Sequence, residues 1–287
     1  MPTTPIDVVH HHLNFAGQNM LSYGSWVLTV VLLAVAVRLG RREKRTPFYL
    51  YLVLASMVAA LAEPLYDVAF ALYFYSQKGM HHTFTAFGIP QPVWAYSGYA
   101  VLYAAPAIYI TYRLRQGRLD RRGLLPVAGV ILLMSCAFEM IGINAGTYTY
   151  WGAHSLRIFQ YPLVIGVLET AQVVCFAVAA AELRRRARSS RDLLALFPLF
   201  PVTFFGANFG AGAAVIIGIH LGHPTTAIVT VLSLVSIVCA GLLIRLAASF
   251  LPDGAATVTV TPPVEADQAA VRAAGSVTMP PGMSAAR

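Results

Sequence analysis

Residues 48–75 read FYLYLVLASMVAALAEPLYDVAFALYFY, an apolar run that holds two acids, Glu63 and Asp67. A helix needs about 20 apolar residues to cross the roughly 30 Å hydrocarbon core of a bilayer, so this run is long enough to span a membrane. An ionisable side chain within such a span costs a few kcal/mol and normally faces the interior of a helix bundle. The run therefore predicts a membrane helix with a buried polar site.

Glu63 and Asp67 are four residues apart, which puts both carboxyls on one face of a helix. Pro64 lies beside Glu63, lacks a backbone N–H and crowds the carbonyl of Ala60. We expect a kink there that opens backbone polar groups beside the acids. Two interpretations follow: a site for chemistry, or structural acids that are hydrogen-bonded to a neighbouring helix.

The composition is that of a polytopic membrane protein. Of 287 residues, 57% are hydrophobic and 11% are charged, whereas a soluble domain averages about 25% charged residues. The net charge of +8 comes from basic residues that cluster between apolar segments, so nucleic-acid binding is not expected. Cys136, Cys175 and Cys239 lie in apolar runs and form no CxxC pair, which favours small core residues over disulfides or a zinc site.

The sequence predicts an all-α fold with seven transmembrane helices. Their approximate bounds are 20–39, 47–75, 92–114, 123–143, 159–182, 193–219 and 224–250. They form one transmembrane domain at 20–250, after an N-terminal extracytoplasmic segment at 1–19. A tail at 251–287, rich in Ala, Pro, Val, Thr and Gly, is expected to be a disordered cytoplasmic extension.

The basic residues predict the orientation. The first, third and fifth connections are strongly basic, whereas the second and fourth hold only Lys78 and Arg157 and the sixth holds none. The basic set is Arg38, Arg41, Arg42, Lys44, Arg45, Arg113, Arg115, Arg118, Arg121, Arg122, Arg184, Arg185, Arg186, Arg188 and Arg191. Cytoplasmic loops carry the excess of Lys and Arg, so the N-terminus is expected outside and the C-terminus in the cytoplasm of a multi-pass cell-membrane protein.

Four acids lie well inside the predicted spans and are the candidate catalytic residues: Glu63, Asp67, Glu139 and Glu169. With a rise of 1.5 Å per residue, Glu63 and Glu169 fall near the midplane and the other two fall in the outer half. Asn208 has a similar depth in the sixth segment. We expect these groups to converge inside the bundle, where a carboxylic acid is a usable proton donor.

The connections on the predicted outer side are rich in aromatic residues. Tyr148, Tyr150 and Trp151 fit two interpretations: anchors in an interfacial aromatic belt, or a lid over the acids. Aromatic faces also stabilise cations. The candidate substrate-binding residues are Tyr66, Trp94, Tyr148, Tyr150, Trp151 and Asn208.

Several chemistries have no support in the sequence. The only lysines are Lys44 and Lys78, and neither lies in mid-span, so a retinal Schiff base is excluded. Patterns for dinucleotides, phosphate loops and nucleophile elbows are missing. Asp67, Glu139 and His81 or His82 give only weak support for a metal site, so neither a metal nor a cofactor is expected.

Residues 138–152 read FEMIGINAGTYTYWG and place a membrane glutamate, Glu139, before a Gly-x-Tyr-x-Tyr turn. This segment resembles a motif of carotenoid hydratases, which are multi-pass enzymes of carotenoid biosynthesis; residues 161–163 and Glu169 also look similar to that family. The stretch around Glu63 is more loosely similar to small seven-helix membrane terpene cyclases, which protonate an isoprenoid epoxide or alkene. The resemblance implies that Glu63, Glu139 and Glu169 are the acids and that aromatic side chains line an isoprenoid chamber.

Three hypotheses about function remain open. The first is an integral-membrane enzyme that hydrates or cyclises a lipophilic isoprenoid by acid catalysis. The second is a proton-coupled transporter that uses the same acids as a relay, and the third is a receptor or structural membrane protein. The expected partners are the lipid bilayer and, for the enzyme, a lipophilic small molecule.

Overall fold

The computed structural model describes residues 5–43 and 46–253. The chain divides into two compact units, Met1–Ala255 and Ala256–Arg287, and every described residue belongs to the first. Lys44 and Arg45 of the first basic connection lie outside the described residues, as does the predicted tail apart from residues 251–253.

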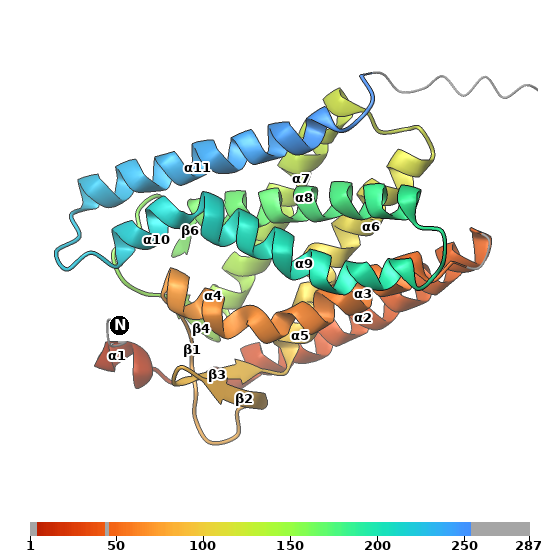
Figure 1. Cartoon of the computed structure of the whole chain (residues 1–287). Helices are drawn as coiled ribbons and strands as arrows, with labels where there is room; N and C mark the ends of the chain where they lie inside the picture. Colours follow the sequence, from red (N-terminus) through yellow and green to blue (C-terminus); the bar gives the residue numbers. More distant parts are fainter. Residues whose placement is uncertain (1–4, 44–45, 254–287) are drawn as a thin grey trace, which may run out of the picture. The chain divides into compact units, whose positions relative to one another are not determined.

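Most of the described chain is helical (Figure 1). The helices are α1 Ile6–Val9, α2 Phe15–Arg42, α3 Phe48–Ala59, α4 Glu63–Phe70, α5 Trp94–Tyr99, α6 Ala105–Arg115, α7 Arg121–Asn144, α8 Leu163–Arg186, α9 Leu196–Phe205, α10 Ala213–Ile219 and α11 Thr226–Ser249. Single turns of other helix types adjoin them: the 3₁₀ turns η1 Ala60–Ala62 and η3 Asp192–Ala195, and the π-helical turns η2 Ala100–Ala104 and η4 Gly206–Ala211.

Within residues 5–43 and 46–253, six helical segments are long and apolar enough to cross a membrane. They are Phe15–Arg42, Phe48–Phe70, Arg121–Asn144, Leu163–Arg186, Asp192–Ala211 and Thr226–Ser249. Large apolar side chains on their outer faces are exposed, for example Val27 on α2, Leu133 on α7 and Val238 on α11. A continuous apolar exterior is stable in lipid but not in water. The fold is therefore that of a helical, membrane-embedded protein.

The predicted span at 92–114 is a helical run made of α5, η2 and α6 end to end. Pro106 lies at the start of α6 and has no N–H to offer the carbonyl of Leu102, one turn earlier. The π-helical turn η2 occupies this position, as such turns often interrupt longer helices.

Helix α8 lies at the centre of the bundle. It packs against α6, α7, α9 and α11. Of the 18 most apolar consecutive residues of α8, 78% are buried, whereas the same share for α11 is 22%. A helix that is apolar all round is typical of such a central position. Polar side chains in the middle of α8, such as Glu169, Thr170 and Gln172, are therefore buried among other helices.

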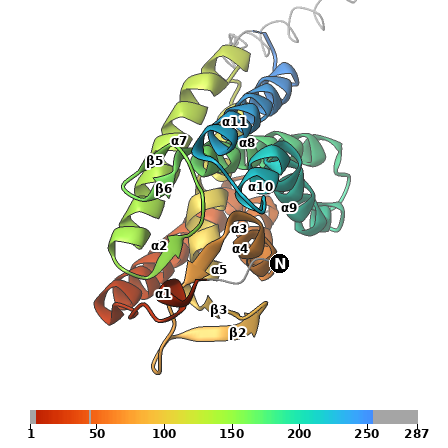
Figure 2. The same ribbon diagram turned by 90° about the vertical axis from the view of Figure 1, so that its left-hand side faces the viewer.

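The all-α prediction is incomplete, because the described part of the chain has six short strands in the connections at one end of the bundle (Figures 1 and 2). They pair antiparallel as three two-stranded sheets: β1 Leu72–Phe74 with β4 Tyr148–Tyr150, β2 His82–Ala86 with β3 Ile89–Pro92, and β5 Arg157–Ile158 with β6 Tyr161–Pro162. In the first sheet Leu72 faces Tyr150 and Phe74 faces Tyr148. This sheet brings together two connections that are far apart in sequence.

Three predicted boundaries are corrected by the structure. The second span ends at Phe70 rather than near 75, because Ala71 is left-handed (φ 52°) and the chain continues as strand β1. The fifth span begins at Leu163 rather than 159. Residues 15–19 of the predicted outer segment belong to α2, since the Asn14 side chain accepts hydrogen bonds from the N–H groups of residues 16 and 17 and starts the helix there.

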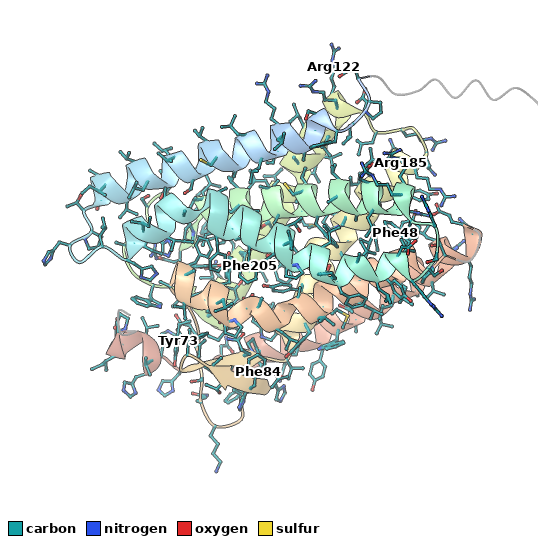
Figure 3. The ribbon with its side chains drawn as sticks, in the orientation of Figure 1. Phe48, Tyr73, Phe84, Arg122, Arg185 and Phe205 are labelled. Carbon is teal, nitrogen blue, oxygen red and sulfur yellow. The ribbon has the colours of Figure 1, made fainter. Side chains whose placement is uncertain are left out.

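The two ends of the bundle differ in chemistry. Arg122 and Arg185 lie at one end, and Tyr73 and Phe84 lie toward the other (Figure 3). We call these the arginine-rich end, where α2, α6 and α8 finish, and the aromatic end, where the strands lie.

Candidate functional site

The acids of the opening stretch lie at a break in the second span. Helix α3 tightens into the 3₁₀ turn η1 before α4 starts at Glu63. Pro64 cannot donate to the carbonyl of Ala60, so an α-helical ladder cannot continue through this point. A 3₁₀ turn thus lies where the kink was expected, and Glu63 is in the first turn of α4.

Three glutamates from three helices line one cavity inside the bundle. Glu63 comes from α4, Glu139 from α7 and Glu169 from α8. All three are buried, with 8%, 8% and 3% of their surface exposed. The predicted convergence of these acids is thus found in the structure.

Each of these carboxyls accepts hydrogen bonds from hydroxyl groups. Glu139 Oε2 accepts from the hydroxyls of Tyr148 and Tyr150, both at 3.1 Å. The Tyr99 hydroxyl donates to Glu63.

Glu169 has the largest set of donors. Its Oε2 accepts from Tyr161 at 3.1 Å and from the Ser135 hydroxyl, and its Oε1 accepts a long bond of 3.5 Å from Tyr66. Among the described residues, the ion pairs of Arg and Lys involve other acids, so the three glutamates meet neutral donors. Neutral hydroxyls can both give and accept protons, which suits a proton-transfer site.

Asp67 is fully buried but does not line this cavity. Its Oδ2 accepts a hydrogen bond of 2.6 Å from the Gln91 side chain on β3. Its Oδ1 and Gln91 Oε1 are buried without a hydrogen-bond partner among the described residues. Asp67 therefore lies one helical turn beyond Glu63, against the β2–β3 sheet.

Four of the six predicted substrate-binding residues line the cavity: Tyr66, Trp94, Tyr148 and Tyr150. The other two do not. Trp151 is half-buried, and its backbone N–H donates to the carbonyl of Ala71 at 2.8 Å. Asn208 is fully buried, but its side-chain nitrogen donates to the carbonyl of Phe204 in its own helix.

Several residues of the cluster were not predicted. Tyr99, Tyr103 and Phe138 line the cavity, and Ser135 and Tyr161 bind Glu169. A helical signal existed for some of them, since Ser135 precedes Glu139 by four residues and Tyr99 precedes Tyr103 by four. That spacing places each pair on one helix face.

Three aromatic rings of the cavity lining come from β1, α5 and β4. Phe74 on β1, Trp94 on α5 and Tyr148 on β4 lie in mutual contact, with ring centroids 5.5–5.7 Å apart. Gly142 makes room for this arrangement, because a Cβ at that position would come within 2.5 Å of the Tyr148 ring. The cavity has a volume of about 30 Å³, enough for a water molecule or two.

The weakly supported metal site is not assembled. Among the described residues, no group of three or more His, Cys, Asp and Glu side chains is placed to hold a metal ion. Asp67 is bound to Gln91 and Glu139 to tyrosines, as described above.

The fold and the buried cluster define the class: a helical membrane protein with a carboxyl–tyrosine site in its interior. Comparison of the chain with protein-family models, curated proteins and solved structures gave no match.

Proposed function

We propose that the protein is an integral-membrane enzyme that hydrates or cyclises a lipophilic isoprenoid, a terpenoid or a carotenoid, by acid catalysis. One observation carries the proposal: Glu63, Glu139 and Glu169 meet in a cavity that is otherwise lined by aromatic and apolar side chains. A proton donor, a proton acceptor and cation-stabilising ring faces are what this chemistry requires.

In the proposed reaction, one glutamic acid donates its proton to an alkene carbon of the substrate. The alkene electron pair forms the new C–H bond and leaves a carbocation, which the faces of the surrounding Tyr and Trp rings stabilise. In hydration, water attacks the cation and loses a proton to a carboxylate of the cluster. In cyclisation, a second alkene of the substrate attacks, and a carboxylate removes a proton from the ring product.

The small cavity sets a condition on this mechanism. An isoprenoid cannot fit into about 30 Å³, so binding must displace side chains. The rings of Phe74, Trp94 and Tyr148 are the proposed moving part, since two of them belong to the short β1–β4 sheet rather than to long helices. Their return over the substrate would exclude water from the cation.

The resemblance to carotenoid hydratases supports the same reaction class. In the resembling segment, the two tyrosines of the Gly-x-Tyr-x-Tyr turn are Tyr148 and Tyr150, and both donate to Glu139. The motif's glutamate and tyrosines thus act on one another directly, as expected of a functional motif rather than of separate interface anchors.

We further propose seven transmembrane helices in the cell membrane, with the N-terminus outside and the arginine-rich end in the cytoplasm. The six long apolar helices account for six of the spans, and the run α5–η2–α6 is the remaining one. The support for the orientation is the excess of arginine at one end of the bundle.

Proton-coupled transport is the second candidate, and the cavity size favours it. A water-sized space among acids and hydroxyls can hold a proton relay without movement of side chains, whereas an isoprenoid requires such movement. The two candidates differ in their products, because a transporter leaves every lipid unchanged.

The experiment incubates membranes that contain the protein with isoprenoid and carotenoid precursors and follows the lipids by mass spectrometry. The enzyme predicts a product heavier by one water, or an isomer of unchanged mass with a new retention time. Membranes without the protein are the control. In parallel, liposomes that contain the purified protein and a pH-sensitive dye report proton movement. Proton flux without any lipid product would replace the enzyme with the transporter.

A further inference from the structure

A second and much larger cavity lies at the arginine-rich end, between α6, α8 and the residues that follow α11. Its volume is about 410 Å³, which is within the range of about 300–1,000 Å³ that is usual for ligand sites. Three arginines form its polar side, Arg115, Arg184 and Arg185, and its apolar side includes Val178, Ala181 and Leu251. None of the acid-site residues takes part in it.

The charges around this cavity do not cancel. Glu43 accepts hydrogen bonds from both Arg115 and Arg184, the latter at 2.6 Å. Glu182 accepts from Arg185 at 2.7 Å. Glu182 also accepts from Arg186, so two carboxylates meet four guanidinium groups and positive charge is in excess here.

Arg184 is held in a fixed position at this cavity. Its guanidinium lies 4.5 Å from the centre of the Phe48 ring and 5.0 Å from that of Tyr49. Its Nη1 is buried without a hydrogen-bond partner among the described residues. A guanidinium that is already ordered loses little further freedom when it binds an anion.

We propose that this cavity binds the phosphate of an anionic membrane phospholipid and the first part of its acyl chain. Arginine forks match phosphate oxygens with paired hydrogen bonds, and basic pockets between membrane helices bind anionic headgroups. The surplus positive charge complements the negative charge of a phosphodiester. Val178, Ala181 and Leu251 provide the apolar wall that an acyl chain needs. This site goes beyond the proposed reaction and does not depend on it.

Native mass spectrometry of the purified full chain tests the proposal. The probes are phosphatidylglycerol and phosphatidylcholine with identical acyl chains, and inorganic phosphate is added as a competitor. The first variant is Arg185→Gln, whose side chain is 70% exposed, so that the fold does not depend on it. The matched control is Arg186→Gln, because Arg186 binds the same Glu182 but does not line the cavity.

We expect phosphatidylglycerol to bind more tightly than phosphatidylcholine. Arg185→Gln should weaken phosphatidylglycerol binding about fivefold, the usual effect of one basic residue at an anionic surface, whereas Arg186→Gln should leave it unchanged. Ala181→Leu fills the apolar wall and keeps all charges, and it should also weaken binding.

Three results would overturn the proposal. Equal losses in the Arg185 and Arg186 variants would mean that the lipid responds only to general charge. Equal binding of phosphatidylcholine would mean that the phosphate charge is not recognised. Displacement of the lipid by millimolar inorganic phosphate, with no effect of Ala181→Leu, would assign the cavity to free phosphate instead of lipid.

Discussion

Tyr150 donates a hydrogen bond of 3.1 Å to Glu139 Oε2, although the two residues belong to different elements, β4 and α7. Tyr150 is only 1% exposed, so its ring does not face lipid as an interface anchor does. Strand β4 of the connection after α7 therefore contributes buried side chains to the interior of the bundle. Through this hydrogen bond, a tyrosine of the Gly-x-Tyr-x-Tyr turn binds the carboxyl of Glu139 directly.

The Tyr150–Glu139 contact predicts two graded effects. Tyr150→Phe keeps the ring face and removes one of the two tyrosine donors to Glu139 Oε2, so activity should fall severalfold and stability by about 1 kcal/mol. Glu139→Gln removes the acid and should cost more activity than Tyr150→Phe. Turnover and thermal unfolding of both variants in detergent provide the measurement. Greater damage from the phenylalanine variant would contradict the assigned roles.

Gly142 should tolerate no side chain. A Cβ there would meet the Tyr148 ring and hydroxyl at 2.5 Å, so Gly142→Ala should push Tyr148 away from Glu139 and destabilise the fold by about 1–3 kcal/mol. Gly129→Ala on the same helix is the matched control, since nothing lies within 4 Å of its Cβ. Alanine at 129 should be neutral or slightly stabilising. Equal melting temperatures for the two variants would contradict the close packing of Tyr148.

Acid should weaken the aromatic end through His154, which lies in the connection outside the membrane spans. The pKa of His154 is lowered from 6.5 to about 4, mainly by burial; the hydrogen bond to the Phe70 carbonyl opposes this shift, and the charges of Arg157 and His220 contribute to it. The unfolded chain binds this proton near pH 6.5, whereas the folded chain binds it only near pH 4. The contribution of neutral His154 to the free energy of unfolding is therefore fully present above pH 6.5. It is lost as the pH falls from 6.5 toward about 4. The loss is about 3 kcal/mol at most.

The pH effect is measured as the melting temperature of the protein in detergent between neutral pH and about pH 4. His154→Gln keeps a donor for the Phe70 carbonyl and should flatten the curve. His223→Gln, at an exposed loop position, should leave the curve as in the wild type. An unchanged curve in the His154 variant would rule out this histidine as the origin of acid sensitivity.

The proposed topology predicts an alternating pattern of reporter fusions. Fusions after Leu39 and Gly117 should report the cytoplasm, and those after Gly79 and Gly152 should report the outside, because arginine-rich connections are retained in the cytoplasm. A cytoplasmic signal at Gly79 would refute the orientation.

Run length and the cost of burying charge were enough to predict most of the helices and the burial of the acids. Glu63, Asp67, Glu169 and Asn208 are all buried, as their depth in apolar runs indicated. Composition could not show where a span stops, however. Residues 71–75 are as apolar as the helix before them, and only the left-handed Ala71 ends it.

The partners within the site were harder to predict, because an apolar run does not reveal how its helix is rotated. Tyr99 resembles an ordinary apolar residue in the sequence, yet it donates to Glu63. Asp67 and Asn208 have suitable depths but do not line the cavity. Their side chains turn to Gln91 and to the backbone of Phe204, contacts that depend on tertiary packing.

The most direct test of the central claim is the rate at which membranes convert the isoprenoid when Glu63, Glu139 or Glu169 is replaced by Gln. Glutamine keeps the shape of the side chain but cannot act as an acid. At position 169 it can still accept from Ser135 and Tyr161. The account predicts a loss of about 10²- to 10⁴-fold for whichever of Glu63, Glu139 and Glu169 donates the proton. Asp253→Asn, at an exposed carboxylate, should retain the wild-type rate. Full activity in all three Glu→Gln variants would contradict acid catalysis at this site.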